Sequence, residues 1–173
     1  FFINYMNFLK SLLFIPLFLF SQERVAIIDF EAINVSELEA SALTKRLVSE
    51  LIDLQEFRVV ERSEMRQILS EQKFQHSGCV DMKCAVEIGR IIEAQYMILS
   101  SVSKVGKTYS LDSRLISVTT SEAYNSARYS TKDGIDNLFE YGVRSIAHEI
   151  SDKAIPTDVI DANKPTLINF IKK

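Results

Sequence analysis

The sequence contains few of the residues on which most catalytic and cofactor-binding motifs depend. Only five glycines, two histidines and two cysteines occur among its 173 residues, and no Walker loop, GxGxxG, HExxH or GxSxG motif is present. So few glycines leave little material for a loop that cradles phosphates. The histidines, His76 and His148, offer few candidates for the base of a nucleophile–base pair. We therefore expect a protein that is not an enzyme, with no cofactor, no bound metal and no evident small-molecule substrate.

Charge and composition exclude further classes of protein. The chain has 20 Lys and Arg residues against 23 Asp and Glu residues, which gives a net charge of -3. Nucleic-acid-binding domains are usually clearly basic, so we expect no nucleic-acid partner. The hydrophobic fraction of 47% is too high for a disordered chain. Two cysteines are too few for a small protein held together by disulfides. The values fit one globular domain.

Apolar residues are concentrated at the start of the chain, where the first twenty positions hold six of the eleven phenylalanines. Met6 is a candidate start, followed by Lys10 and then by nine apolar residues at 12–20. This order is typical of a signal peptide. The run is about half of the roughly 20 residues that a membrane-spanning helix needs. The sequence therefore predicts a signal peptide at residues 1–22 and a periplasmic or outer-membrane-associated protein.

Short apolar runs then alternate with segments whose apolar residues recur every three or four positions. Residues 25–30 (VAIIDF) have the branched apolar composition of a strand that is buried on both faces. Ser36 and Glu39 match a capping box, which predicts a helix from there to about Leu54. The same reasoning predicts strands near residues 58–61 and 95–102, and helices that begin at Ser63 and Asp81.

The second half of the chain predicts a meander followed by a long helix. Apolar and polar residues alternate in residues 108–118, and another strand follows at 122–129. Residues 134–152 have the periodicity of an amphipathic helix. The expected fold class is α/β, a two-layer mixed sheet of about five strands with three to four packed helices. This domain would span residues 23–152, and residues 153–173 would form a C-terminal tail.

Both cysteines lie in the densest polar cluster of the chain, which spans nine residues and contains His76, Cys79, Asp81 and Cys84. The spacing of the cysteines is looser than in structural zinc sites, and a CxxC redox motif is missing. Two unpaired structural cysteines are another alternative. We favour a disulfide between Cys79 and Cys84, because predicted export places the thiols in an oxidising compartment. Such a short loop would contribute about 2 kcal/mol.

Two segments carry a family resemblance: VAIIDF at residues 25–30, and residues 58–123, which begin RVVERSEMRQILSEQ. With the helix between them, they resemble the CsgG-like and LpoB-like periplasmic envelope proteins, whose core domain is similar to the N-terminal domain of TolB. The resemblance covers roughly residues 24–150. It implies a periplasmic α/β module that binds other proteins or assembles with itself, and it supplies no catalytic residues.

The chain departs from this family in two respects. Family members commonly carry a lipid-anchored cysteine directly after the signal peptide, and no cysteine follows the apolar run here. The long amphipathic hairpins with which the curli channel builds its barrel find no room between the predicted elements. We therefore assign no residues of this chain to contact with a membrane.

Together these observations predict an exported, non-catalytic envelope protein. It would act as a protein-binding or assembly component in secretion, surface-structure assembly or wall-synthesis regulation. Its partners would be other envelope proteins or further copies of itself. An alternative is a self-assembling periplasmic ring of an outer-membrane secretion channel.

Overall fold

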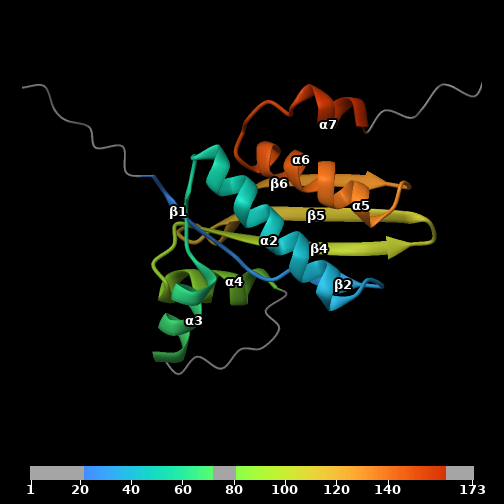
Figure 1. The fold of residues 1–173 in the computed structure, drawn as a ribbon. Helices are drawn as coiled ribbons and strands as arrows, with labels where there is room; N and C mark the ends of the chain where they lie inside the picture. The colour runs from blue at the N-terminus through green and yellow to red at the C-terminus, as the bar shows by residue number, and fades with distance from the viewer. Residues whose placement is uncertain (1–21, 72–80, 163–173) are drawn as a thin grey trace, which may run out of the picture.

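A computed structural model describes residues 22–71 and 81–162 and shows a six-stranded mixed sheet in the order β3-β1-β4-β5-β6 (Figure 1). The short β2 continues the line of β1 and also pairs with β4. The pairs β1–β3, β1–β4 and β2–β4 are parallel, whereas β4, β5 and β6 form an antiparallel meander. The strands are β1 (Arg24–Ile27), β2 (Glu31–Ile33), β3 (Arg58–Val59), β4 (Tyr96–Val105), β5 (Thr108–Ser117) and β6 (Glu122–Thr131).

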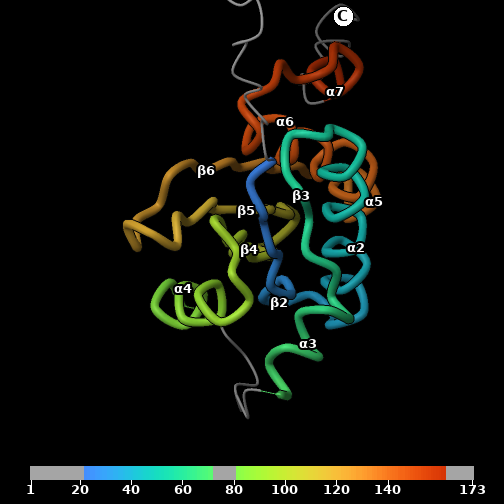
Figure 2. The backbone as a smooth tube through the Cα atoms, turned by 90° about the vertical axis from the view of Figure 1, so that its left-hand side faces the viewer, coloured from blue at the N-terminus to red at the C-terminus, as the bar shows by residue number. Residues whose placement is uncertain are grey.

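Helices pack on both faces of this sheet. Figure 2 shows α2, α5 and α6 on one side and α4 on the other. The mixed α/β sheet with packed helices that the sequence predicts is confirmed, and the structure adds that α4 makes a partial third layer. The helical elements are α2 (Glu37–Leu54), α3 (Arg62–Glu71), α4 (Met82–Ile91), α5 (Ile135–Asn137), the π-helical turn η1 (Leu138–Gly142), α6 (Val143–Ile150) and α7 (Thr157–Ala162).

The first core lies between the sheet and the pair α2 and α6. Leu43, Leu47 and Leu51 follow one another at four-residue steps along α2 and are at most 1% exposed. They pack with Ile98 of β4 and with Ile146 of α6 in one apolar cluster. The apolar residues whose three-and-four spacing predicts this helix therefore form its buried face.

The predicted capping box starts α2. The Glu39 N–H donates to Ser36 Oγ at 3.2 Å, and the Ser36 N–H donates to Glu39 Oε2 at 2.8 Å. The Ser36 hydroxyl donates a hydrogen bond to the Glu39 carboxylate, and the Ser36 backbone N–H donates another. These two bonds, of which the hydroxyl's has the larger effect, hold the pKa of Glu39 below its ordinary value. Both groups satisfy amides that the helix itself leaves open.

We expect replacement of Ser36 by alanine to lower the melting temperature more at pH 7 than at about pH 3. A carboxyl with a lowered folded pKa stabilises the fold above its unfolded pKa of about 4.3 and loses that contribution as the pH falls through the folded value. Thermal unfolding of wild type and Ser36→Ala across this range measures the difference. Ser49→Ala, an exposed serine of the same helix, is the control. A difference in melting temperature between wild type and Ser36→Ala that stays constant with pH would contradict this role of the Glu39 carboxylate.

The second core lies on the opposite face, beneath α4. Asp81 is the N-cap of α4, as predicted, and its Oδ1 accepts from the Cys84 N–H at 2.8 Å. The helix packs on Met97 and Val118 so closely that a Cβ on Gly89 would lie 2.5 Å from Val118 Cγ2. The adjacent α3 begins at Arg62, so Ser63 lies inside the helix and does not cap it as we predicted.

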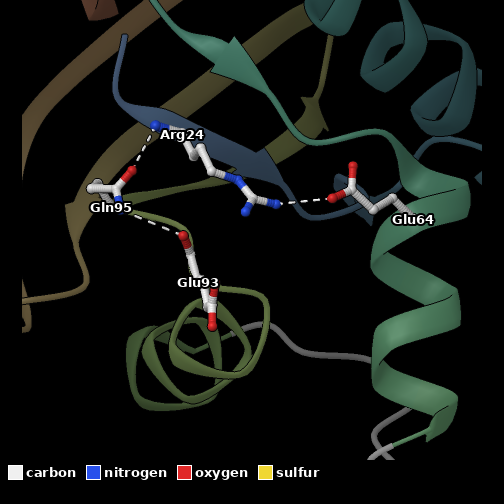
Figure 3. A network of polar contacts seen from close by, with 4 residues as sticks. All are labelled: Arg24, Glu64, Glu93 and Gln95. Carbon is white, nitrogen blue, oxygen red and sulfur yellow. Dashed lines mark hydrogen bonds and ion pairs between the residues drawn. The ribbon is translucent and has the colours of Figure 1, made fainter. Parts of the chain in front are cut away.

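Polar contacts join the start of β1 to this second face (Figure 3). Arg24 donates from Nη2 to Glu64 Oε1 of α3 at 2.9 Å, and from its backbone N–H to Gln95 Oε1 at 2.8 Å. Gln95 in turn donates to the Glu93 carbonyl at 3.4 Å, between α4 and β4. Because the ion pair is partly exposed, it contributes little stability. Its effect is to orient α3 against β1.

Candidate functional site

One face of the meander is covered by a described helix at one end only. Side chains alternate along β4, so that Ile98 and Val102 enter the first core while Leu99 and Ser101 point to the opposite face. On that opposite face α4 covers only the end near Met97 and Val118. Beyond this point the three strands continue without a described helix over this face, and Figure 2 shows α4 on this side, with α2, α5 and α6 on the other.

This uncovered face is polar and built mostly from small side chains. One row of register partners crosses four strands and consists of Glu31, Ser101, Asp112 and Arg128. In that row Arg128 and Asp112 form an ion pair. In the next row Ser110 and Ser130 share a hydrogen bond between their hydroxyls. A flat surface with hydroxyl and charged groups results.

A shallow groove of about 580 Å³ crosses this face between β1 and β6. Its charged lining residues are Asp29, Glu31, Asp112, Arg114 and Arg128. Asp29 pairs with Arg62 at the start of α3. Among the described residues, Glu31 and Arg114 form no ion pair. The groove is therefore acidic toward β1 and β2 and carries its two arginines toward β5 and β6.

This arrangement suits recognition better than bond making or breaking. The charged groups of the groove are exposed or half-exposed, including those that form ion pairs. Acid–base catalysis usually relies on titratable groups that are desolvated within a cleft. Within residues 22–71 and 81–162, no group of three His, Cys, Asp or Glu side chains could hold a metal ion.

Comparison with models of protein families identifies the family that this sequence matches. The family model for the curli production assembly/transport component CsgG matches residues 13–129, which is more than half of the chain. The chain belongs to the CsgG family. The resemblance that the sequence suggested is thereby confirmed for this CsgG-family chain. A search of curated protein sequences gave no match.

Solved structures share the fold of this CsgG-family chain. The LpoB C-terminal domain from Salmonella enterica is 19% identical with a TM-score of 0.55, over 64% of this chain and 83% of that chain. The LpoB C-terminal domain from Escherichia coli is 18% identical with a TM-score of 0.55, over 64% and 82%. Lipoprotein GNA1162 from Neisseria meningitidis is 11% identical with a TM-score of 0.54, over 65% and 81%. At these identities the likeness concerns the fold alone.

The predicted cysteine pair falls partly outside the described residues. Cys79 and His76 both lie there, so the disulfide between Cys79 and Cys84 stays a prediction. Cys84 itself is on the first turn of α4, is 8% exposed and packs in the second core. His148 lies on α6, where its Nδ1 is 2.7 Å from the Ala154 carbonyl oxygen and holds the chain that follows the helix.

The groove was not identified as a site from the sequence of this CsgG-family chain. The signal was present, because polar residues alternate with apolar ones through residues 108–118 and 122–131. That pattern predicts that each strand has a polar face. It does not predict that β2 and β6 lie beside β4 and β5 and join their polar faces into one surface. Separately, no helix in the described part of the chain is both long and apolar enough to cross a membrane.

Proposed function

We propose that this CsgG-family chain is an exported, non-catalytic component of the cell envelope that works by binding other proteins. Secretion, surface-structure assembly and wall-synthesis regulation are the processes it would serve. Family membership carries the proposal, since the matching family is described as a curli production assembly and transport component. The shared fold of the LpoB C-terminal domain is consistent with it.

The proposal includes export to the periplasm or the outer membrane. Residues 1–22 would be the signal peptide, residues 23–152 the binding domain and residues 153–173 a tail. The support is the apolar run at 12–20 with Lys10 before it.

The uncovered face of the meander is the surface that we propose for partner binding. Its serine side chains are small, so another protein can approach the strands closely. Arg114 and Glu31 carry charges without an ion-pair partner in the described part of the chain, at opposite sides of the groove. Charges placed in this way select a partner with the complementary arrangement.

We expect Arg114→Glu to weaken partner binding by about tenfold, because it places a like charge where a partner carboxylate would sit. Capture from envelope extracts by the chain at residues 23–173, followed by mass spectrometry, identifies a partner. Affinity measurements with the purified partner then quantify the effect. The control is Lys45→Glu, which changes the net charge equally on the exposed side of α2. Equal affinities of both variants would remove this face as the binding surface.

A second candidate function is a self-assembling periplasmic ring of an outer-membrane secretion channel. The transport role in the family description favours it. Mass photometry at micromolar concentration separates the two candidates. A strict monomer under these conditions excludes the ring and leaves the component that binds other envelope proteins.

A further inference from the structure

Apolar side chains are exposed together at one end of the molecule. Seven large hydrophobic residues are exposed in the described part of the chain, and three come from this end: Ile33 of β2, Leu38 on the first turn of α2, and Val105 of β4. Leu38 is 81% exposed, the highest fraction of the seven. Asn34 Nδ2 donates to the Lys104 carbonyl at 3.3 Å and joins these segments. Exposed apolar residues gathered in one place are typical of a contact surface.

A free carboxylate accompanies the exposed leucine. Glu37 directly precedes Leu38, is exposed, and forms no ion pair within residues 22–71 and 81–162. The Glu39 carboxylate is already engaged, because it accepts from the N–H and the hydroxyl of Ser36. Glu37 is therefore the carboxylate that another molecule can meet together with Leu38. We refer to Glu37 and Leu38 as the α2 tip.

A groove of the complementary character lies along α4. It has a volume of about 530 Å³, and its apolar lining consists of Met82 and of Val86, which is 5% exposed. Its charged lining consists of Lys83, Glu87 and Arg90, all exposed. None of these three forms an ion pair with another described residue. Two cations against one carboxylate make this α4 groove basic.

Arg90 is held beside the α4 groove by a second element of the fold. Its Nη2 donates to Ser121 Oγ at 3.3 Å, in the turn between β5 and β6. A guanidinium has five N–H donors in a fixed arrangement, and the remaining ones have no partner in the described part of the chain. A carboxylate that enters the groove therefore meets an oriented donor, and this lowers the entropic cost of binding.

We propose that the α2 tip of one copy of this chain binds in the α4 groove of the next copy. Leu38 lies against Met82 and Val86, and Glu37 pairs with Arg90. Transfer of the leucine from water to an apolar lining supplies most of the binding energy. The opposite charges of the tip and the groove set the orientation and exclude partners with the reverse arrangement.

The places of the two surfaces make this contact head-to-tail. Figure 2 shows α2 and α4 on opposite sides of the sheet. Because the two surfaces differ, every bound pair leaves one tip and one groove open, and association continues until a ring closes or a filament forms. The inference rests on the second candidate function, self-assembly, and names the contact that would carry it. It does not involve the uncovered face of the meander.

Sedimentation velocity of the purified protein at increasing concentration tests the contact. Wild type forms concentration-dependent species larger than a dimer, whereas Leu38→Ala and Arg90→Glu each weaken association by at least about tenfold. Ile52→Ala is the matched control and has no effect, because Ile52 is another exposed apolar residue of α2. Combining Glu37→Arg with Arg90→Glu restores association, since the ion pair forms again with its charges exchanged.

A mixture of two variants tests the head-to-tail geometry. The groove is intact in Leu38→Ala and the tip is intact in Arg90→Glu, so an equimolar mixture contains one functional contact. The mixture therefore forms pairs and nothing larger, at concentrations where each variant alone is monomeric. Absence of these pairs overturns the proposal. A wild type that stops at a dimer indicates a two-fold contact and also overturns it.

Failure of this contact and failure of the proposed functions give different results. A wild type that stays monomeric at every concentration overturns both the contact and the ring. Larger assemblies that Leu38→Ala and Arg90→Glu leave unchanged overturn the contact and keep the ring. The effect of Arg114→Glu on an envelope partner reports on the uncovered face alone.

Discussion

Leu47→Ala lowers the free energy of unfolding by about 2–5 kcal/mol, because it leaves a cavity where α2 meets the sheet. Leu47 is 0% exposed and belongs to the first core with Ile98 and Ile146. In a chain of this size each kcal/mol lowers the melting temperature by about 2–4 °C. Denaturant unfolding monitored by circular dichroism measures the change.

The same helix supplies a matched control for this prediction. Leu38 lies on the first turn of α2 and is 81% exposed, so Leu38→Ala removes the same atoms from water-exposed surface. Its effect should stay within about 0.5 kcal/mol. Similar losses in the two variants would mean that the first core does not depend on α2 in the way described.

Gly89→Ala should destabilise the protein by about 2 kcal/mol, although alanine is favoured over glycine in a helix by about 1 kcal/mol. The added Cβ would lie 2.5 Å from Val118 Cγ2 and 2.9 Å from Met97 Cγ. Carbon atoms in contact prefer about 3.5–4.0 Å, and valine is stiff at χ1. The helix α4 must therefore move away from the sheet.

A double variant makes this second prediction specific. Val118→Ala removes the methyl group that the new Cβ meets, so Gly89→Ala should cost less in that background, with a coupling energy of about 1 kcal/mol. Glu87→Ala, an exposed position of the same helix, controls for changes in helix propensity. A stabilising effect of Gly89→Ala in the wild-type background would show that α4 packs less closely than the structure indicates.

Local signals in the sequence were sufficient for α2 and for the two long hairpin strands. The capping box and the leucine spacing set α2 correctly, because both act within the helix itself. The predicted strand at 25–30 is different, because β1 ends at Ile27 and a second strand begins at Glu31. An apolar run does not show where the neighbouring strands change. Among the described strands, β1 pairs with β3 and β4, whereas β2 pairs with β4 alone.

Long-range contacts explain the parts that local patterns could not predict. The helix α7 lies in the segment predicted as a tail, and its ion pair with Arg144 depends on a partner outside the segment. The groove has the same origin, because Asp29 and Arg128 come from distant parts of the sequence. The alternation of residues predicts that a polar face exists. It does not predict that α4 stops short of it.

The π-helical turn η1 restricts the insertion or deletion of residues in the helical segment from α5 to α6. The predicted single helix at 134–152 instead contains this wide turn at Leu138–Gly142, before α6. Leu138 and Val143 are five positions apart, yet both are 0% exposed in the first core. Removing one residue here would rotate α6 by about 100° relative to α5 and turn Ile146 away from the sheet. Between Gly134 and Ile150, the number of residues is therefore constrained more tightly than their identity at exposed positions.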